Sequence, residues 1–277
     1  MMNNLAELEF VLLALATAVY AIATAVYWTS VCVGRGLQER WASRIALGGL
    51  LIQLFWFGIR TYQSGHLPAY NGHEFSVTLS GGIVLAVLIF ERLSQRRDLV
   101  AFALPVVLLL LAYAWTLPRS VGPLVPVFKS LWLKTHIISS IMAYSAFATT
   151  FAASCLYLFK ARSTEGDTAQ TLAHLDRVAY QAAIIGFPFM TFCVISGAIW
   201  ADYVWGRYWS WDPKETWSLI TWLIFAAYLH TRYSRGWRQQ KAAILAIVGF
   251  FTVLMTFIGV EIIYQYQMTT FSPLINK

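Results

Sequence analysis

Six of the chain's twelve tryptophans lie within residues 200–222, together with several charged side chains. The charged members are Asp202, Asp212, Lys214 and Glu215. An indole has a large apolar face and one N–H at its edge, so clustered indoles either line a membrane–water interface or form a platform for a flat, amphipathic ligand. Trp205, Trp209 and Trp211 fall in a short polar segment rather than along a helix end. This order favours the platform, and we expect a Trp-rich loop at about residues 200–217.

Two histidines lie where an apolar segment meets a polar one. His136 begins a long apolar run, where the simplest interpretation is a hydrogen-bonded histidine at the membrane interface. His230 follows Glu215 by fifteen residues. On a helix that starts near Trp217, this spacing puts His230 roughly 20 Å deeper than the loop. The simplest interpretation for His230 is an interfacial histidine next to Arg232.

The other histidines and the cysteines carry weaker signals. His66 and His174 lie in polar connections, where we expect them to be solvated, whereas His73 lies close to the start of an apolar run. The sequence has no Cys-x-x-Cys pair, which argues against thiol exchange and against a structural zinc site. We expect the dispersed cysteines to be small buried side chains. They are Cys32, Cys155 and Cys193.

Composition defines an all-α, polytopic membrane protein. The 277 residues are 58% hydrophobic and 12% charged, and the mean hydropathy is +0.60. The strand alternation that a membrane barrel needs is absent, and no block is long and polar enough for a soluble domain. We therefore expect residues 1–277 to form a single integral membrane domain in the lipid bilayer, without a cleaved leader and without any role in nucleic-acid binding.

The apolar runs predict about eight transmembrane helices. They fall at about 8–30, 45–60, 75–91, 99–117, 131–159, 178–201, 217–233 and 243–265. Alternate connections, at 31–44, 92–98, 160–177 and 234–242, hold most of the Arg and Lys residues. Cytoplasmic loops are enriched in these residues, so we expect those four connections to be cytoplasmic. The Trp-rich loop and both termini are then external, and the net charge of +7 is mainly a topology signal.

The 197–224 segment resembles the tryptophan-rich "WWD" signature of haem-handling proteins in cytochrome c biogenesis. Within that superfamily, Trp-Asp-Pro-Lys-Glu-Thr-Trp at 211–217 and Tyr-Leu-His-Thr-Arg at 228–232 are more similar to the System II family, CcsA or ResC, than to CcmC or CcmF. The resemblance covers roughly residues 120–260. It implies a haem lyase component that handles haem b and delivers it for attachment to the Cys-x-x-Cys-His motif of apocytochrome c, beside a CcsB/ResB-like membrane partner.

The resemblance also implies roles for individual residues. His136 stands in the Trp-Leu-x-x-His context of the family's first external haem ligand, and His230 matches an intramembrane haem ligand whose second ligand comes from the CcsB-like partner. The indoles of Trp205, Trp209 and Trp211 would cover the haem. Asp212, Lys214 and Glu215 would shape the loop, and basic residues such as Arg207 would meet the haem propionates.

One departure from the family pattern concerns the second external ligand. The family has a histidine at the end of the last helix, but no histidine follows His230 in this sequence, and Met268 occupies the corresponding position. Thioether sulfur is a competent axial ligand that favours ferrous iron, so the expected pair is His136 with Met268. His73 is the alternative second ligand.

The missing histidine keeps two other functions open. One is a non-catalytic, haem-binding or regulatory membrane protein that keeps the fold but not the ligation. The other is a transporter for a different hydrophobic ligand. The intact tryptophan motif favours haem delivery over both.

The positive charges make the topology testable. Reporter fusions after Arg97 and Arg238 should report the cytoplasm, and fusions after Pro118 and Lys277 should report the external side, because the basic connections set orientation. An external signal after Arg238 would reverse the placement of the Trp-rich loop.

Overall fold

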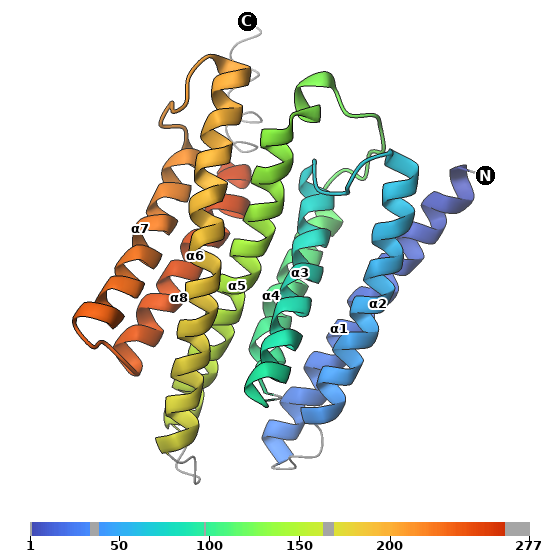
Figure 1. Cartoon of the computed structure of the whole chain (residues 1–277). Coiled ribbons are helices and arrows are strands. Elements are labelled where there is room, and N and C mark those ends of the chain that lie inside the picture. Colours follow the sequence, from blue (N-terminus) through green and yellow to red (C-terminus); the bar gives the residue numbers. More distant parts are fainter. Residues whose placement is uncertain (1, 34–38, 97, 163–168, 264–277) are drawn as a thin grey trace, which may run out of the picture.

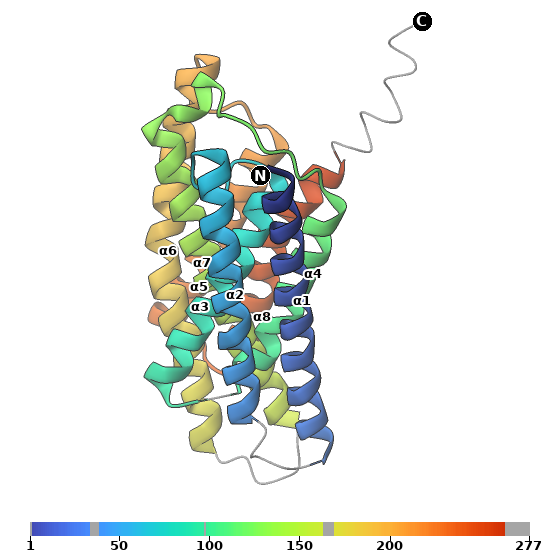
Figure 2. The same cartoon turned by 90° about the vertical axis from the view of Figure 1, so that its right-hand side faces the viewer.

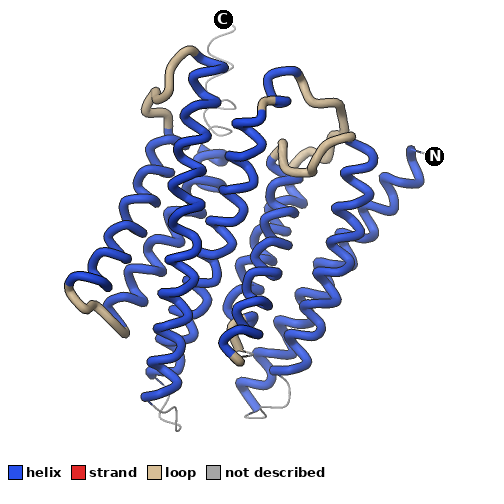
Figure 3. The backbone as a smooth tube through the Cα atoms, viewed as in Figure 1, coloured by secondary structure: helices blue, strands red, loops and turns tan. Residues whose placement is uncertain are grey.

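Helices make up nearly all of the structure. The computed structural model describes residues 2–33, 39–96, 98–162 and 169–263, and this part of the chain contains eight α-helices and no strand (Figure 3). The helices are α1 Met2–Val33, α2 Glu39–Ser64, α3 Gly72–Ser94, α4 Val100–Thr116, α5 Leu131–Arg162, α6 Ala169–Trp205, α7 Pro213–Ser234 and α8 Gln240–Leu254. A short 3-10 helix, Pro126–Lys129, precedes α5, and a π-helical turn, Met255–Gly259, extends α8. The predicted all-α bundle of eight helices is confirmed.

Six helices are long and apolar enough to cross a membrane by length and composition. They are α1, α2, α3, α5, α6 and α8 with its extension to Ile263. The apolar helix α4 is shorter, at 17 residues, and α7 carries more polar side chains. Backbone polar groups in hydrocarbon must be paired internally, and helices satisfy that requirement. The chain is therefore an integral, multi-pass membrane protein.

The helices run up and down the bundle, so the connections gather at two ends (Figures 1 and 2). The Trp end, at the top of Figure 1, holds the start of α1, the 65–71 and 117–130 connections, and the 206–212 loop. The basic end holds the connection between α3 and α4, described at 95–96 and 98–99, and the connection between α7 and α8, at 235–239. This alternation brings the expected external and internal connections to opposite ends.

Helix α5 lies at the centre of the bundle. It contacts α3, α4, α6 and α8, and 72% of its most apolar window is buried inside the protein, against 28% for α1. Its small residues let neighbouring helices approach closely, as is typical of membrane bundles. Side chains on the Trp-end turns of α5 consequently face an interior that several helices share.

The Trp-rich loop is shorter than predicted. We expected it to span about 200–217, but α6 continues to Trp205 and α7 begins at Pro213, so the loop comprises 206–212. A capping box explains why α7 begins at Pro213. Asp212 accepts a hydrogen bond from the backbone N–H of Glu215, and the Glu215 side chain accepts one from the N–H of Asp212. Pro213 at the first helical position strengthens this start. Trp205 therefore ends a helix, contrary to the prediction.

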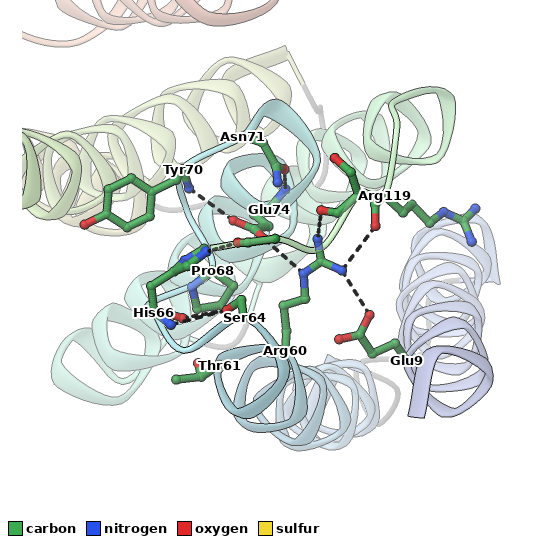
Figure 4. Close-up of polar contacts among 12 residues, drawn as sticks. Glu9, Arg60, Thr61, Ser64, His66, Pro68, Tyr70, Asn71, Glu74 and Arg119 are labelled. Carbon is green, nitrogen blue, oxygen red and sulfur yellow. Dashed lines mark hydrogen bonds and ion pairs between the residues drawn. The ribbon is translucent and has the colours of Figure 1, made fainter. Parts of the chain in front are cut away.

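A buried arginine ties together four segments at the Trp end (Figure 4). Arg60 of α2 is 1% exposed, and its guanidinium pairs with Glu74 of α3 at 2.9 Å and with Glu9 of α1 at 3.2 Å. The same group donates to the backbone carbonyls of Arg119 and Ser120, at 3.3 and 2.6 Å. A planar guanidinium has five N–H donors in a fixed arrangement, which suits this multiple role. Arg60 thus fixes α1, α2, α3 and the 117–125 segment relative to one another.

Removal of this guanidinium should be strongly destabilising. Arg60→Ala leaves Glu9 and Glu74 buried without a cation, which typically costs about 3–5 kcal/mol in free energy of unfolding. The exposed Arg92 of α3 provides the control, and Arg92→Ala should change stability by less than about 0.5 kcal/mol. The measurement is detergent-denaturant unfolding of both variants. Equal stability of the two would mean that the Arg60 cluster does not hold the segments together.

Candidate functional site

A cavity of about 730 Å³ opens at the Trp end of the bundle. It lies between the starts of α3, α5 and α7, the ends of α4 and α6, the 206–212 loop and the π-helical extension of α8. Its size lies within the range of about 300–1,000 Å³ that is usual for cofactor sites. Many aromatic side chains line it: Tyr70, Phe75, Tyr113, Phe128, Tyr144, Trp200, Trp205, Tyr208, Trp209 and Phe257. Burial raises the pKa of the Tyr70 phenol, which keeps this hydroxyl neutral.

The imidazole of His136 is oriented by α6. Its Nδ1 lies 2.9 Å from the carbonyl oxygen of Cys193. A carbonyl only accepts, so Nδ1 carries the proton and Nε2 is left with its lone pair available for a ligand. Histidines that bind metals usually donate their other ring N–H to such an acceptor. The sequence predicted His136 as a ligand, and the geometry provides the orientation that a ligand needs.

A glycine makes room for the His136 ring. A Cβ built on Gly197 would lie 2.7 Å from His136 Nδ1, which is closer than a real side chain allows. The thiol of Cys193 also lies beside the ring, with 3.5 Å between Sγ and Nδ1. Cys193 is 2% exposed, as expected for a small buried side chain, but it also lines the cavity. Cys155 is half-buried, and the side chain of Cys32 lies outside the described residues.

The tryptophans of the motif take different positions. Trp205 and Trp209 line the cavity, whereas Trp211 does not and is 69% exposed. Trp211 has a φ of +60° and meets Trp209 edge-on, with 5.8 Å between ring centroids. The Nε1 atom of Trp209 is buried and has no hydrogen-bond partner among the described residues. An unpaired indole N–H is costly in a buried place, so this donor is suited to an acceptor on a molecule bound in the cavity.

Trp200 joins the cavity through a contact that the sequence did not reveal. Its Nε1 donates to the carbonyl of Val127 at 3.3 Å, and its ring packs near Phe128 at 6.5 Å. This bond links the end of α6 to the 3-10 helix before α5. Its only sequence signal was membership of the tryptophan cluster.

His73 lines the cavity, but its ring turns towards other helices. Its Nδ1 donates to the carbonyl of Ala114 in α4 at 2.9 Å, and the ring meets Trp56 of α2 edge-on. Gly82, nine residues later in α3, packs against Ser145 of α5. At 3.6 residues per turn, nine residues amount to two and a half turns, so His73 lies on the opposite face of α3. The Nδ1 bond leaves His73 with a lone pair on Nε2, as in His136. What disfavours His73 as the partner of His136 across a bound ligand is the position of its ring, on the face of α3 turned towards α2 and α4.

His230 does not line the described cavity. His230 lies near the basic end of α7, exposed, with Ser234 Oγ 3.5 Å from its Nδ1. Two positions on, Arg232 turns inward and pairs with Asp176 of α6 at 2.6 and 2.9 Å. His230 is therefore available to a partner at the edge of the bundle. Met268 lies outside the described residues.

Two of the polar residues predicted to shape the loop do so through hydrogen bonds. Asp212 caps α7 and lines the cavity, and Glu215 Oε2 also accepts from the backbone N–H of Ser210 at 2.7 Å. Lys214 lines the cavity and pairs with Glu261 at 3.2 Å. Arg207 is exposed and does not line the cavity. No sequence signal pointed to Glu261, which approaches Lys214 from just beyond the π-helical turn that extends α8.

The fold and this site define a class of polytopic helical membrane proteins with an aromatic ligand cavity at one end of the bundle. The family model described as "Cytochrome C assembly protein" matches residues 71–266, from the start of α3 through α8. The chain belongs to this family.

Several similar proteins carry the name "Cytochrome c biogenesis protein CcsA". The chain is 37% identical over 241 residues to "Cytochrome c biogenesis protein CcsA" of Prochlorococcus marinus (strain NATL2A), covering 74% of this chain and 76% of that protein. It is 32% identical over 323 residues to the CcsA protein of Synechocystis sp., covering 94% and 96% of the two chains. A solved structure, "Cytochrome c Heme Lyase CcmF", superposes with a TM-score of 0.67 at 18% identity, covering 91% of this chain and 46% of that one. This last likeness is one of fold.

Proposed function

We propose that the chain acts in cytochrome c biogenesis by binding haem in the cavity at the Trp end and presenting it for attachment to apocytochrome c. The single observation that carries this proposal is the position of His136 in a cavity walled by indoles. Its Nδ1 is bonded to the Cys193 carbonyl, and within the described part of the chain its Nε2 is left for a ligand. Family membership supports the same function.

The residues of the cavity fit a haem b substrate. A porphyrin is flat and largely apolar, and aromatic side chains from six helical elements and two loops surround the space. Imidazole is a common axial ligand of haem iron. The vinyl groups of the haem supply the carbons to which the thiols of a Cys-x-x-Cys-His motif become attached. The chain's own contribution is to bind, orient and shield the macrocycle, which is catalysis by positioning.

Met268 is the second external ligand in this proposal. The π-helical extension of α8 reaches the cavity, where Thr256, Phe257 and Glu261 line it. Met268 follows Glu261 by seven residues in the sequence. The direction of the His73 ring, towards α2 and α4, supports the choice of Met268 over His73.

His230 forms the second haem site in this proposal, at the basic end. Its exposure at the edge of the bundle suits ligation shared with a CcsB/ResB-like membrane protein, which would supply the opposite ligand. By the positive-inside rule, the basic connections support a cytoplasmic position for this end. The termini and the cavity then face the external side, where apocytochrome c receives its haem.

His136 and its packing provide the direct test. His136→Ala should remove the axial ligand, and Gly197→Ala should push the ring off its carbonyl partner and lower haem affinity about tenfold. Gly58→Ala is the matched control, because a Cβ there meets nothing within 4 Å. Haem content and the Soret spectrum of purified protein are measured, with His230→Ala as background to isolate the Trp-end site. Unchanged spectra in both variants would refute ligation by His136.

The two neighbouring tryptophans should differ in their effects. Trp209→Ala removes a cavity wall and should weaken haem binding about tenfold, whereas Trp211→Ala, which removes an exposed ring, should weaken it less than about threefold. Titration of both variants with haem, in the His230→Ala background, distinguishes them. An equal loss would indicate that the loop acts as a membrane-interface belt rather than as a binding wall.

A further inference from the structure

The cavity contains one cation among the residues that the structure describes along its lining. This is Lys214 in the first turn of α7, and its Nζ lies 3.2 Å from Glu261 Oε2 at the end of α8. The side chains are 54% and 37% exposed. Ion pairs this open to solvent contribute little to stability, so the lysine can exchange its carboxylate partner at small cost.

The other two carboxylates of the lining are already engaged. Asp212 accepts from the N–H of Glu215, and Glu215 accepts from Ser210 and from the N–H of Asp212. These bonds belong to the capping box of α7 and hold the loop. Glu261, by contrast, accepts its side-chain hydrogen bond from Lys214. It is therefore the carboxylate that a ligand can replace.

A second donor on the same loop lacks an acceptor. The indole N–H of Trp209 is buried at the cavity and unpaired within the described part of the chain. An indole nitrogen donates only, so a ligand that satisfies it must present an acceptor. Trp209 and Lys214 are five residues apart in the sequence, and both line the cavity. Both donors suit an anionic oxygen.

We propose that Lys214 and the Trp209 N–H form a carboxylate-binding subsite, in which a carboxylate of the bound ligand replaces Glu261 as the partner of Lys214. The inference rests on the proposed function, under which the carboxylates are the haem propionates. It assigns the propionate edge to the first turn of α7 instead of to Arg207, which lies outside the cavity lining. Glu261 then acts as a competitor that keeps Lys214 in place when no haem is bound.

The test compares haem with its dimethyl ester, which has the same macrocycle but no carboxylates. Binding to purified protein is titrated in the His230→Ala background, without apocytochrome. Lys214→Gln should weaken haem binding about tenfold and leave ester binding unchanged, because only the acid loses a charge-assisted hydrogen bond. Trp209→Phe should likewise weaken haem more than ester. Arg207 is a neighbouring exposed cation, so Arg207→Gln is the matched control. It should change the affinity for neither haem nor the ester.

Glu261→Gln distinguishes the carboxylate subsite from a purely structural ion pair. It frees Lys214 from its competitor and should tighten haem binding about threefold, while ester binding stays the same. A purely structural ion pair would instead make Lys214→Gln and Glu261→Gln weaken haem and ester alike, and that result would overturn the subsite.

Two further outcomes distinguish a failure of this inference from a failure of the proposed function. If neither haem nor ester binds to the protein, the proposed function fails together with the subsite. If both bind equally well to every variant, haem binding stands and the subsite is wrong. A Lys214→Gln protein that loses affinity only for an added Cys-x-x-Cys-His peptide would assign the lysine to the peptide carboxylate and would also overturn the proposal.

Discussion

The ion-pair cluster of Arg60 is the interaction on which the Trp end of the bundle depends. One buried guanidinium contacts Glu9, Glu74 and two backbone carbonyls of the 117–125 segment, which come from elements far apart in the sequence. Charges buried in this way are stabilising only when all their partners are in place. The cluster thereby fixes the start of α3 and the segment that follows α4, and both of these form part of the cavity wall.

The opposite wall depends on a different kind of constraint. Helices α5 and α6 approach so closely that Gly197 is needed beside His136, and the Cys193 carbonyl determines which ring nitrogen stays free. The capping box of α7 then closes the loop over the same space. The site thus combines a rigid histidine from the bundle with indoles from a short loop, and rigid placement is what catalysis by positioning requires.

The two histidines predicted as ligands lie at different ends of the molecule, and each has a suitable environment. His136 is held inside a cavity, whereas His230 stands exposed at the edge of the bundle beside the inward-turned Arg232. Under the proposed function, the site at His230 would receive haem through a partner protein, and the site at His136 would hold it for reaction. His230 lies roughly 20 Å along α7 from Glu215 at 1.5 Å per residue, which is about two-thirds of a bilayer core.

The sequence by itself determined the eight helices, the position of the Trp-rich motif and the separation of His136 from His230, because hydropathy and helical rise are local properties. It also contained the capping signal at Asp212 and Glu215, which limits the loop to 206–212. Only the tertiary structure decided that Trp209 faces the cavity while Trp211 does not, that His73 turns towards α4, and that Glu261 meets Lys214. These features depend on the rotation of each helix and on contacts between distant segments, which packing sets and local sequence does not.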